Sequence, residues 1–158
     1  MQPKPCFQWA MRLAFAIIFS TSLPAAEPPE LLKGFPRSQI IIETKTACRL
    51  FDVYIARGTQ QRAQGLMHVR ALAADEGMIF LFPSVTVITM WMKNTYIPLD
   101  MIFLTPDGTV SSVHENAIPH STEIISSGTA AAAVIELIGG TARRYGIKAG
   151  DRVIFPAG

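Results

Sequence analysis

The chain has 158 residues, 49% of them hydrophobic, with 14 Lys and Arg against 12 Asp and Glu. The two surplus basic residues, Lys4 and Arg12, lie in the first 26 residues, so the rest of the sequence carries twelve charges of each sign. This balance argues against nucleic acid or an anionic membrane surface as a partner. The sequence also lacks glycine patterns that cradle phosphate, nucleophile elbows and paired His or Cys spacings for zinc, which excludes the classes that these motifs mark.

The N-terminus has the order of a secretory leader: two basic residues, an apolar run at 13–23, and then two alanines. The run is too short to span a bilayer comfortably, so residues 1–26 are predicted to be a signal peptide. Cleavage is expected after Ala26, with Ser22 as an alternative and an uncleaved anchor as another. The mature protein is therefore expected to be exported, periplasmic or extracellular, with no membrane span.

The residues after the leader, 27–37, contain three prolines and one glycine and are predicted to form a flexible tether. A single β-rich domain, 38–158, is expected to follow. Its first two runs rich in β-branched residues, Ser38–Glu43 and Cys48–Ala56, flank three polar residues. This pattern predicts an opening hairpin.

A short helix is predicted from Thr59 to Met67, with Thr59 as its N-cap. An apolar run follows at 78–82, and Pro83 is expected to stop it. The runs Val85–Met92 and Leu99–Leu104 have the length and composition of strands and are separated by a turn signal. We expect these two runs to pair as a central hairpin.

The remaining elements are a strand at 110–115, a surface loop at 114–127, a buried strand at 130–138, a short helix at 141–144 and a last strand at 152–155. The sequence therefore predicts a mainly β protein of the α+β kind, with two short helices. The expected architecture is one compact, mostly antiparallel domain, either a sandwich or barrel-like.

Several stretches of the chain match a known family in order and spacing. They are Arg62–Met67 with Arg70 and Leu72, Gly77–Phe80, Trp91–Thr95, Ile97–Asp100 with Phe103, Gly108–Val110, Glu136 with Leu137 and Gly140, and Gly146–Asp151. Over residues 38–156 the sequence resembles the secreted bacterial and archaeal family called domain of unknown function 192. The resemblance implies a compact β-rich fold and an exported or membrane-attached location. It implies no activity, because the family has none assigned.

A candidate ligand site lies around the predicted central hairpin. Trp91, Lys93, Asn94, Tyr96 and Asp100 are expected to converge at one end of it. Aromatic rings with a few directed polar groups suit a sugar or peptide ligand. The alternative is structural: a core tryptophan, an ordinary ion pair and a turn-forming asparagine.

Glu136 interrupts an otherwise apolar run. A buried carboxylate must be paired, hydrogen-bonded or protonated, and a structural ion pair with Lys93, Arg62, Arg70 or Arg143 is the favoured interpretation. Glu136 and Arg62 are included in the candidate site as supports behind the ligand contacts.

The sequence thus favours an exported cell-envelope module that binds a glycan or peptide fragment, with no cofactor or metal expected. One alternative is a hydrolase or lyase acting on envelope polymers with Asp100 and Glu136 as acid and base. Another is a copper-handling protein that uses the thioethers of Met90 and Met92. Whether the protein is an enzyme, and its oligomeric state, are left open.

Overall fold

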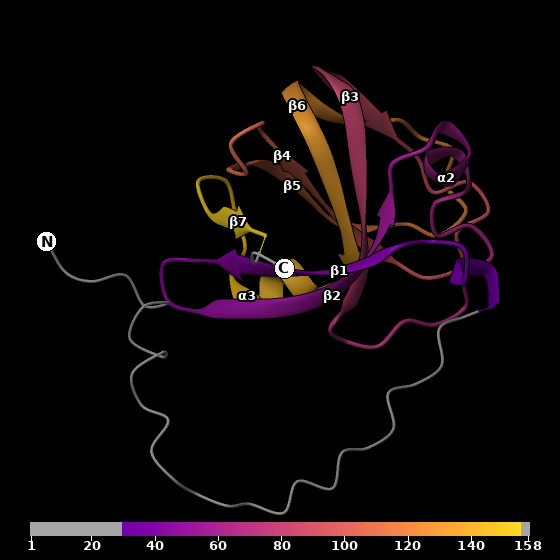
Figure 1. Ribbon diagram of the computed structural model, residues 1–158, viewed down its shortest axis with the longest axis horizontal. Coiled ribbons are helices and arrows are strands. Elements are labelled where there is room, and N and C mark those ends of the chain that lie inside the picture. The colour runs from indigo at the N-terminus through magenta and orange to yellow at the C-terminus, as the bar shows by residue number, and fades with distance from the viewer. Residues whose placement is uncertain (1–29, 156–158) are drawn as a thin grey trace, which may run out of the picture.

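The computed structural model describes residues 30–155, so the predicted signal peptide lies outside the described residues. The fold is mainly β with two short helices, as predicted (Figure 1). Its elements are a 3-10 turn η2 (Glu30–Leu32), β1 (Arg37–Glu43), β2 (Cys48–Ala56), α2 (Thr59–Gln64), β3 (Glu76–Met90), β4 (Leu99–Leu104), β5 (Val110–Ala117), β6 (Ile125–Ile138), α3 (Thr141–Tyr145) and β7 (Arg152–Ile154).

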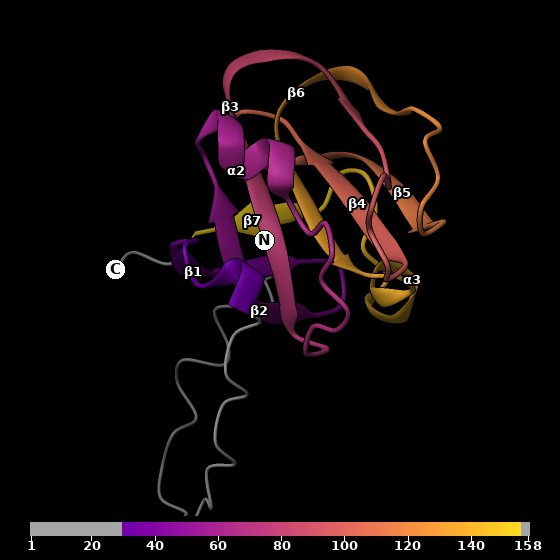
Figure 2. The same ribbon diagram turned by 90° about the vertical axis from the view of Figure 1, so that its right-hand side faces the viewer.

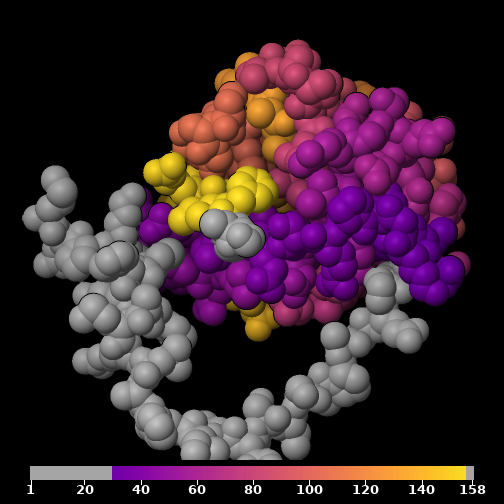
Figure 3. Space-filling model, in the orientation of Figure 1, coloured from indigo at the N-terminus to yellow at the C-terminus, as the bar shows by residue number. Residues whose placement is uncertain are grey.

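The strands form one curled sheet in the order β5-β4-β6-β3-β2-β1-β7. All neighbours are antiparallel except β2 and β3, which α2 and the loop after it connect in parallel. The curl brings β7 back to the turn before β5, where Thr109 bridges to Arg152 (Figure 3). Of the two predicted architectures the barrel-like one is confirmed, in the form of a half-barrel.

Side chains on both faces are buried in the middle of the sheet, along β4 and the last part of β6, which explains why these segments are apolar runs in the sequence. The enclosed face gathers residues from every strand, including Ile40, Phe51 and Ile135. The outer face carries a second core, with Met78 and Phe103 among its members. This second core is covered by α2 and the loops on that side (Figure 2). All six residues of β4 are buried for this reason.

The predicted central hairpin is wrong. The last part of β3 and the whole of β4 do form strands, but β6 lies between them and pairs with both. Ile135, for example, is opposite Ile79 on one side and Ile102 on the other. A long run that is apolar on both faces is suited to a central position, and β6 takes that place ahead of the local pairing.

Two boundaries also differ from prediction. Pro83 does not end its strand, because β3 continues through it with a register shift between Leu81 and Thr86. A proline has no N–H to give to the ladder, and such a shift accommodates it. The predicted loop at 114–127 is shorter than expected, since β5 extends to Ala117 and β6 begins at Ile125.

The described part of the predicted tether, from residue 30 onward, packs on the domain. Leu32 is 1% exposed and Phe35 is 8% exposed, and both belong to the outer-face core. The opening hairpin is confirmed by the antiparallel pairing of β1 and β2, and both short helices form. Among residues 30–155 no helix is long and apolar enough to cross a membrane.

Candidate functional site

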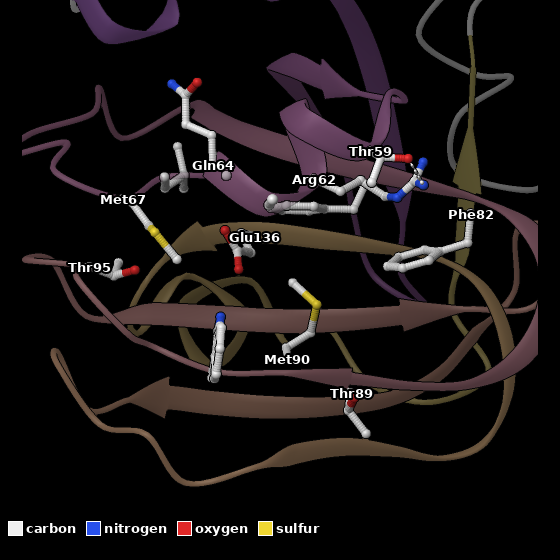
Figure 4. Close-up of a pocket in the computed structure, with 14 residues that line it drawn as sticks. Thr59, Arg62, Gln64, Met67, Phe82, Thr89, Met90, Thr95 and Glu136 are labelled. Atoms are coloured by element: carbon white, nitrogen blue, oxygen red, sulfur yellow. Dashed lines mark hydrogen bonds between the residues drawn. The ribbon is translucent and has the colours of Figure 1, made fainter.

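A cavity of about 250 Å³ opens on the outer face of the sheet, between α2 on one side and β3 and β6 on the other (Figure 4). Half of its lining residues are apolar and half carry a polar side-chain group, with two aromatic rings from β3 and thioethers from two separate segments. The lining residues are Thr59, Arg62, Ala63, Gln64, Gly65, Leu66, Met67, Phe80, Phe82, Thr89, Met90, Trp91, Thr95 and Glu136. Glu136 and Arg62 are the only charged residues among them.

Glu136 lies near the C-terminal end of β6, at the floor of this cavity (Figure 4). It is opposite Met78 on β3 and Met101 on β4, so apolar side chains flank it across both ladders. Only 4% of the residue is exposed. The sheet therefore holds a carboxyl group in apolar surroundings with an opening toward the cavity.

The carboxyl group of Glu136 has no hydrogen bond or ion pair within residues 30–155. The predicted ion pair with Lys93, Arg62, Arg70 or Arg143 is wrong: Arg143 instead pairs with Glu115 at 3.2 Å. Because burial disfavours the charged form, the pKa of Glu136 rises to about 8. At neutral pH the group is mostly a protonated acid that can donate one hydrogen bond.

Arg62 forms one wall of the cavity, and its guanidinium is held by neutral partners. It donates to the carbonyl oxygen of Leu81 at 3.1 Å and to that of Arg57, and it contacts the hydroxyl of Thr59 at 3.4 Å. The Cζ atom of Arg62 also lies 5.5 Å from the ring centre of Phe82. Arg62 thus ties α2 to β3, and it supports the pocket as a clamp between these elements.

Trp91 follows β3 and lies at the rim of the cavity, with 47% of its surface exposed. The ammonium of Lys93 is 5.3 Å from the centre of the indole ring. Alternation would place these two side chains on one side of an extended segment, and the contact is consistent with that expectation. A half-exposed indole beside a cavity is available to cover a bound molecule.

Asn94 and Tyr96 do not line the cavity. Asn94 adopts a left-handed backbone, with φ of 57°, and its carbonyl accepts from the N–H of His68 at 2.8 Å. Tyr96 packs in a separate cluster between His68 and His120, with ring-centre distances of 5.8 and 4.8 Å, and Arg70 lies over its ring. These residues shape the loop next to the site.

Asp100 is fully buried and points away from the cavity. It is opposite Leu137 on β6, whereas its neighbour Met101 is opposite Glu136, so the two acids lie on opposite faces of the sheet. The Asp100 carboxylate accepts from the N–H groups of Asn116, Gly140 and Ala142 at 2.7 to 3.0 Å. The expected convergence of Asp100 with Trp91 is therefore wrong, and so is its pairing with Glu136 as acid and base.

The sequence missed most of the cavity walls. Phe80 and Phe82 come from β3 and Met67 from the segment after α2, and a linear pattern cannot bring these segments together, although it does single out Met90. Met92, its expected partner for copper, is fully buried in the outer-face core. No group of three or more His, Cys, Asp or Glu suited to a metal ion occurs in the described part of the chain.

Two solved structures are similar to the chain. A candidate transcription regulator from Sinorhizobium meliloti 1021 is 43% identical, with a TM-score of 0.75, 77% of this chain covered and 95% of that one. A protein of unknown function from Novosphingobium aromaticivorans DSM 12444 is 35% identical, with a TM-score of 0.77, 85% of this chain covered and 94% of that one.

No curated protein matches the chain. The family model of domain of unknown function 192, described as "Uncharacterized ACR", matches residues 40–155, which is most of the sequence. The chain therefore belongs to the domain of unknown function 192 family.

Proposed function

We propose that this protein is an exported cell-envelope module that binds a small ligand, a glycan or peptide fragment, in the cavity between α2, β3 and β6. The observation that carries the proposal is Glu136, a buried acid at the cavity floor with no partner in the described chain. Buried polar groups are almost always hydrogen-bonded, so one that faces an open cavity is a natural contact for a ligand.

The cost of Glu136 to the folded state supports this role. Its pKa of about 8 means that the fold must either keep the group protonated or bury a charge. A glutamine or an apolar residue at this position would avoid that penalty. Residues that lower stability are typical of functional sites. An acid with a shifted pKa in a pocket is retained there for the contact that it makes with a ligand.

The cavity walls suggest how a ligand would be held. Phe80, Phe82 and Trp91 present aromatic surface to an apolar part of the ligand. Glu136 supplies a directed polar contact at the floor, and Arg62 keeps the α2 wall in place through its bonds to main-chain carbonyls. The other expected ligand contacts, Lys93, Asn94 and Tyr96, would act at the rim or through the adjacent loop.

The description of the S. meliloti relative as a candidate transcription regulator does not lead us to propose a nucleic-acid partner. Beyond residue 26 the sequence has twelve basic and twelve acidic residues. Proteins that bind the phosphate backbone of nucleic acids usually present a basic face. Its Lys and Arg side chains release counterions from the phosphates, and this release supplies much of the affinity. The candidate cavity carries one guanidinium, and neutral groups already engage it.

The fluorescence of Trp91 tests the proposal directly. Trp9→Phe leaves Trp91 as the only tryptophan in the chain. In this background, titration with cell-wall glycan and peptide fragments is expected to give a saturable change in emission. Glu136→Gln should weaken that response, while Glu115→Gln, which alters an acid outside the cavity, should leave it unchanged. A flat titration with every fragment would contradict the proposal.

A further inference from the structure

We infer that the cavity admits the ammonium group of a small amine with an apolar body, and that this ammonium pairs with the carboxylate of Glu136. The inference rests on the proposed binding function and specifies the chemistry of the ligand. It starts from the geometry: a 4% exposed carboxyl group facing a cavity of about 250 Å³, with no donor beside it in the described chain.

Half of the lining residues carry polar side-chain groups, but Glu136 is the only charged one without a partner in the described chain, so the lining favours one charged group on the ligand. A sugar carries a hydroxyl on most of its carbons, and each would need a donor or acceptor once removed from water. Apart from Glu136 and the clamped Arg62, the side chains that offer such groups are Thr59, Gln64, Thr89, Thr95 and the indole of Trp91. Apolar groups make up the remaining wall, which suits an apolar body with a single charged end.

The charge of the ligand follows from what Glu136 lacks. An ionised carboxylate in this position needs a cation, and none of the ion pairs of the described chain supplies one. Arg62 is the only other charged residue that faces the cavity, and its guanidinium is bonded to carbonyl oxygens and a hydroxyl. The flanking residues on β3 and β4, Met78 and Met101, are uncharged. An incoming ammonium would complete the missing pair.

This pairing has a distinctive proton balance. Burial raises the pKa of Glu136 to about 8, so at pH 7 the acid must lose its proton before it pairs with an ammonium. About one proton should therefore leave the protein for each amine bound at pH 7, and affinity should rise roughly tenfold from pH 6 to pH 7 before levelling above pH 8. A neutral ligand that only accepts a hydrogen bond from the acid would show neither effect.

The experiment compares three probes of one length, n-pentylammonium, n-pentanol and n-pentanoate, by isothermal titration calorimetry on the protein purified after export. Titrations in buffers of different ionisation enthalpy count the protons released. We expect pentylammonium to bind at least about tenfold more tightly than pentanol at pH 8, with the proton release given above. Glu136→Gln should abolish both the preference and its pH dependence while pentanol binding is retained. Glu115→Gln, which removes a charge at an exposed ion pair, is the matched control and should behave as the wild type.

The outcomes separate the two proposals. Equal binding of pentylammonium and pentanol, binding of pentanoate instead, or amine binding without proton release would overturn the inference on the ligand while leaving the cavity as a binding site. An unchanged preference in Glu136→Gln would do the same. If none of the probes binds and the glycan and peptide fragments also leave Trp91 unaffected, both the ligand class and the proposed binding function are wrong.

Discussion

Asp100 and Glu136 lie on adjacent strands one ladder position apart, and both are buried, yet their surroundings are opposite. Asp100, on the enclosed face, accepts three main-chain hydrogen bonds and fixes the start of α3. Glu136, on the outer face, accepts none in the described chain and faces a cavity. Burial alone therefore does not identify a functional acid. The difference lies in whether the fold itself satisfies the carboxylate.

The largest expected effect is on how stability depends on pH, which tests whether Glu136 and Asp100 differ as described. The pKa of Glu136 in the folded protein, about 8, is above its ordinary value of 4.5, so the folded state keeps a proton that the unfolded state releases. Stability is therefore lost as pH rises between these values, by about 1.4 kcal/mol per unit and on the order of 5 kcal/mol in total. Urea unfolding of wild type and Glu136→Gln from pH 5 to pH 8 should show a gap that widens in favour of the variant. A gap that stays constant with pH would show that the pKa of Glu136 is not raised in the folded protein.

Removing the Asp100 carboxylate should lower the free energy of unfolding, whereas removing the Glu136 carboxyl group should raise it at high pH. The size of the effect should be slightly smaller. Asp100→Ala leaves the N–H groups of Asn116, Gly140 and Ala142 without their acceptor and should cost about 4 kcal/mol at neutral pH. Asp100→Asn keeps one acceptor and should fall between this variant and the wild type. Chemical denaturation measures both, with the exposed Glu123→Ala as a control expected to stay within about 0.5 kcal/mol. A loss as small as that of the control would mean that Asp100 is not the structural acid.

A change at Arg62 tests whether Glu136 has a counter-ion within the chain. If its role is to clamp α2 to β3, Arg62→Gln should lower the free energy of unfolding by about 1 to 2 kcal/mol at every pH from 5 to 8. Arg57→Gln changes a neighbouring exposed arginine and serves as the control. If Arg62 were instead the counter-ion of Glu136, the stability lost in Arg62→Gln would increase with pH, because Glu136 ionises as pH rises.

Lys93 should give the smallest effect. Its ammonium lies over the exposed ring of Trp91, a contact worth about 0.5 kcal/mol at a solvated position. Lys93→Gln is expected to change the emission of Trp91 in the Trp9→Phe background while leaving the denaturation midpoint almost unchanged. A large loss of stability would place Lys93 among the residues that hold the fold.

The sequence was sufficient for most individual elements and insufficient for their pairing. The run Leu99–Leu104 can be recognised as a strand from its composition, and α3 ends at Tyr145, one residue after its predicted end, where Gly146 adopts φ of 66°. The partner of each strand depends on β6 entering between β3 and β4, which is a long-range choice that local turn signals do not encode.

The site divides in the same manner. Glu136 could be identified because a charge inside an apolar run is informative at any register. Asp100 was assigned to the wrong group because every position of β4 is buried, so alternation gives no indication of which face is which. The cavity itself is formed where α2, β3 and β6 meet, and its aromatic and thioether walls become visible only after the strands are placed in order.

The return of β7 to the beginning of the sheet also affects how the molecule is made. β1 pairs on one side with β2 and on the other with β7. The hydrogen bonds of β1, the first strand of the domain, are therefore complete only when β7, the last strand, is in place. A chain that emerges from a ribosome in order can form its opening hairpin early, but the half-barrel closes only after synthesis reaches the C-terminus. For the export that we propose, late closure of this kind would keep the chain extended enough to pass through a translocation channel.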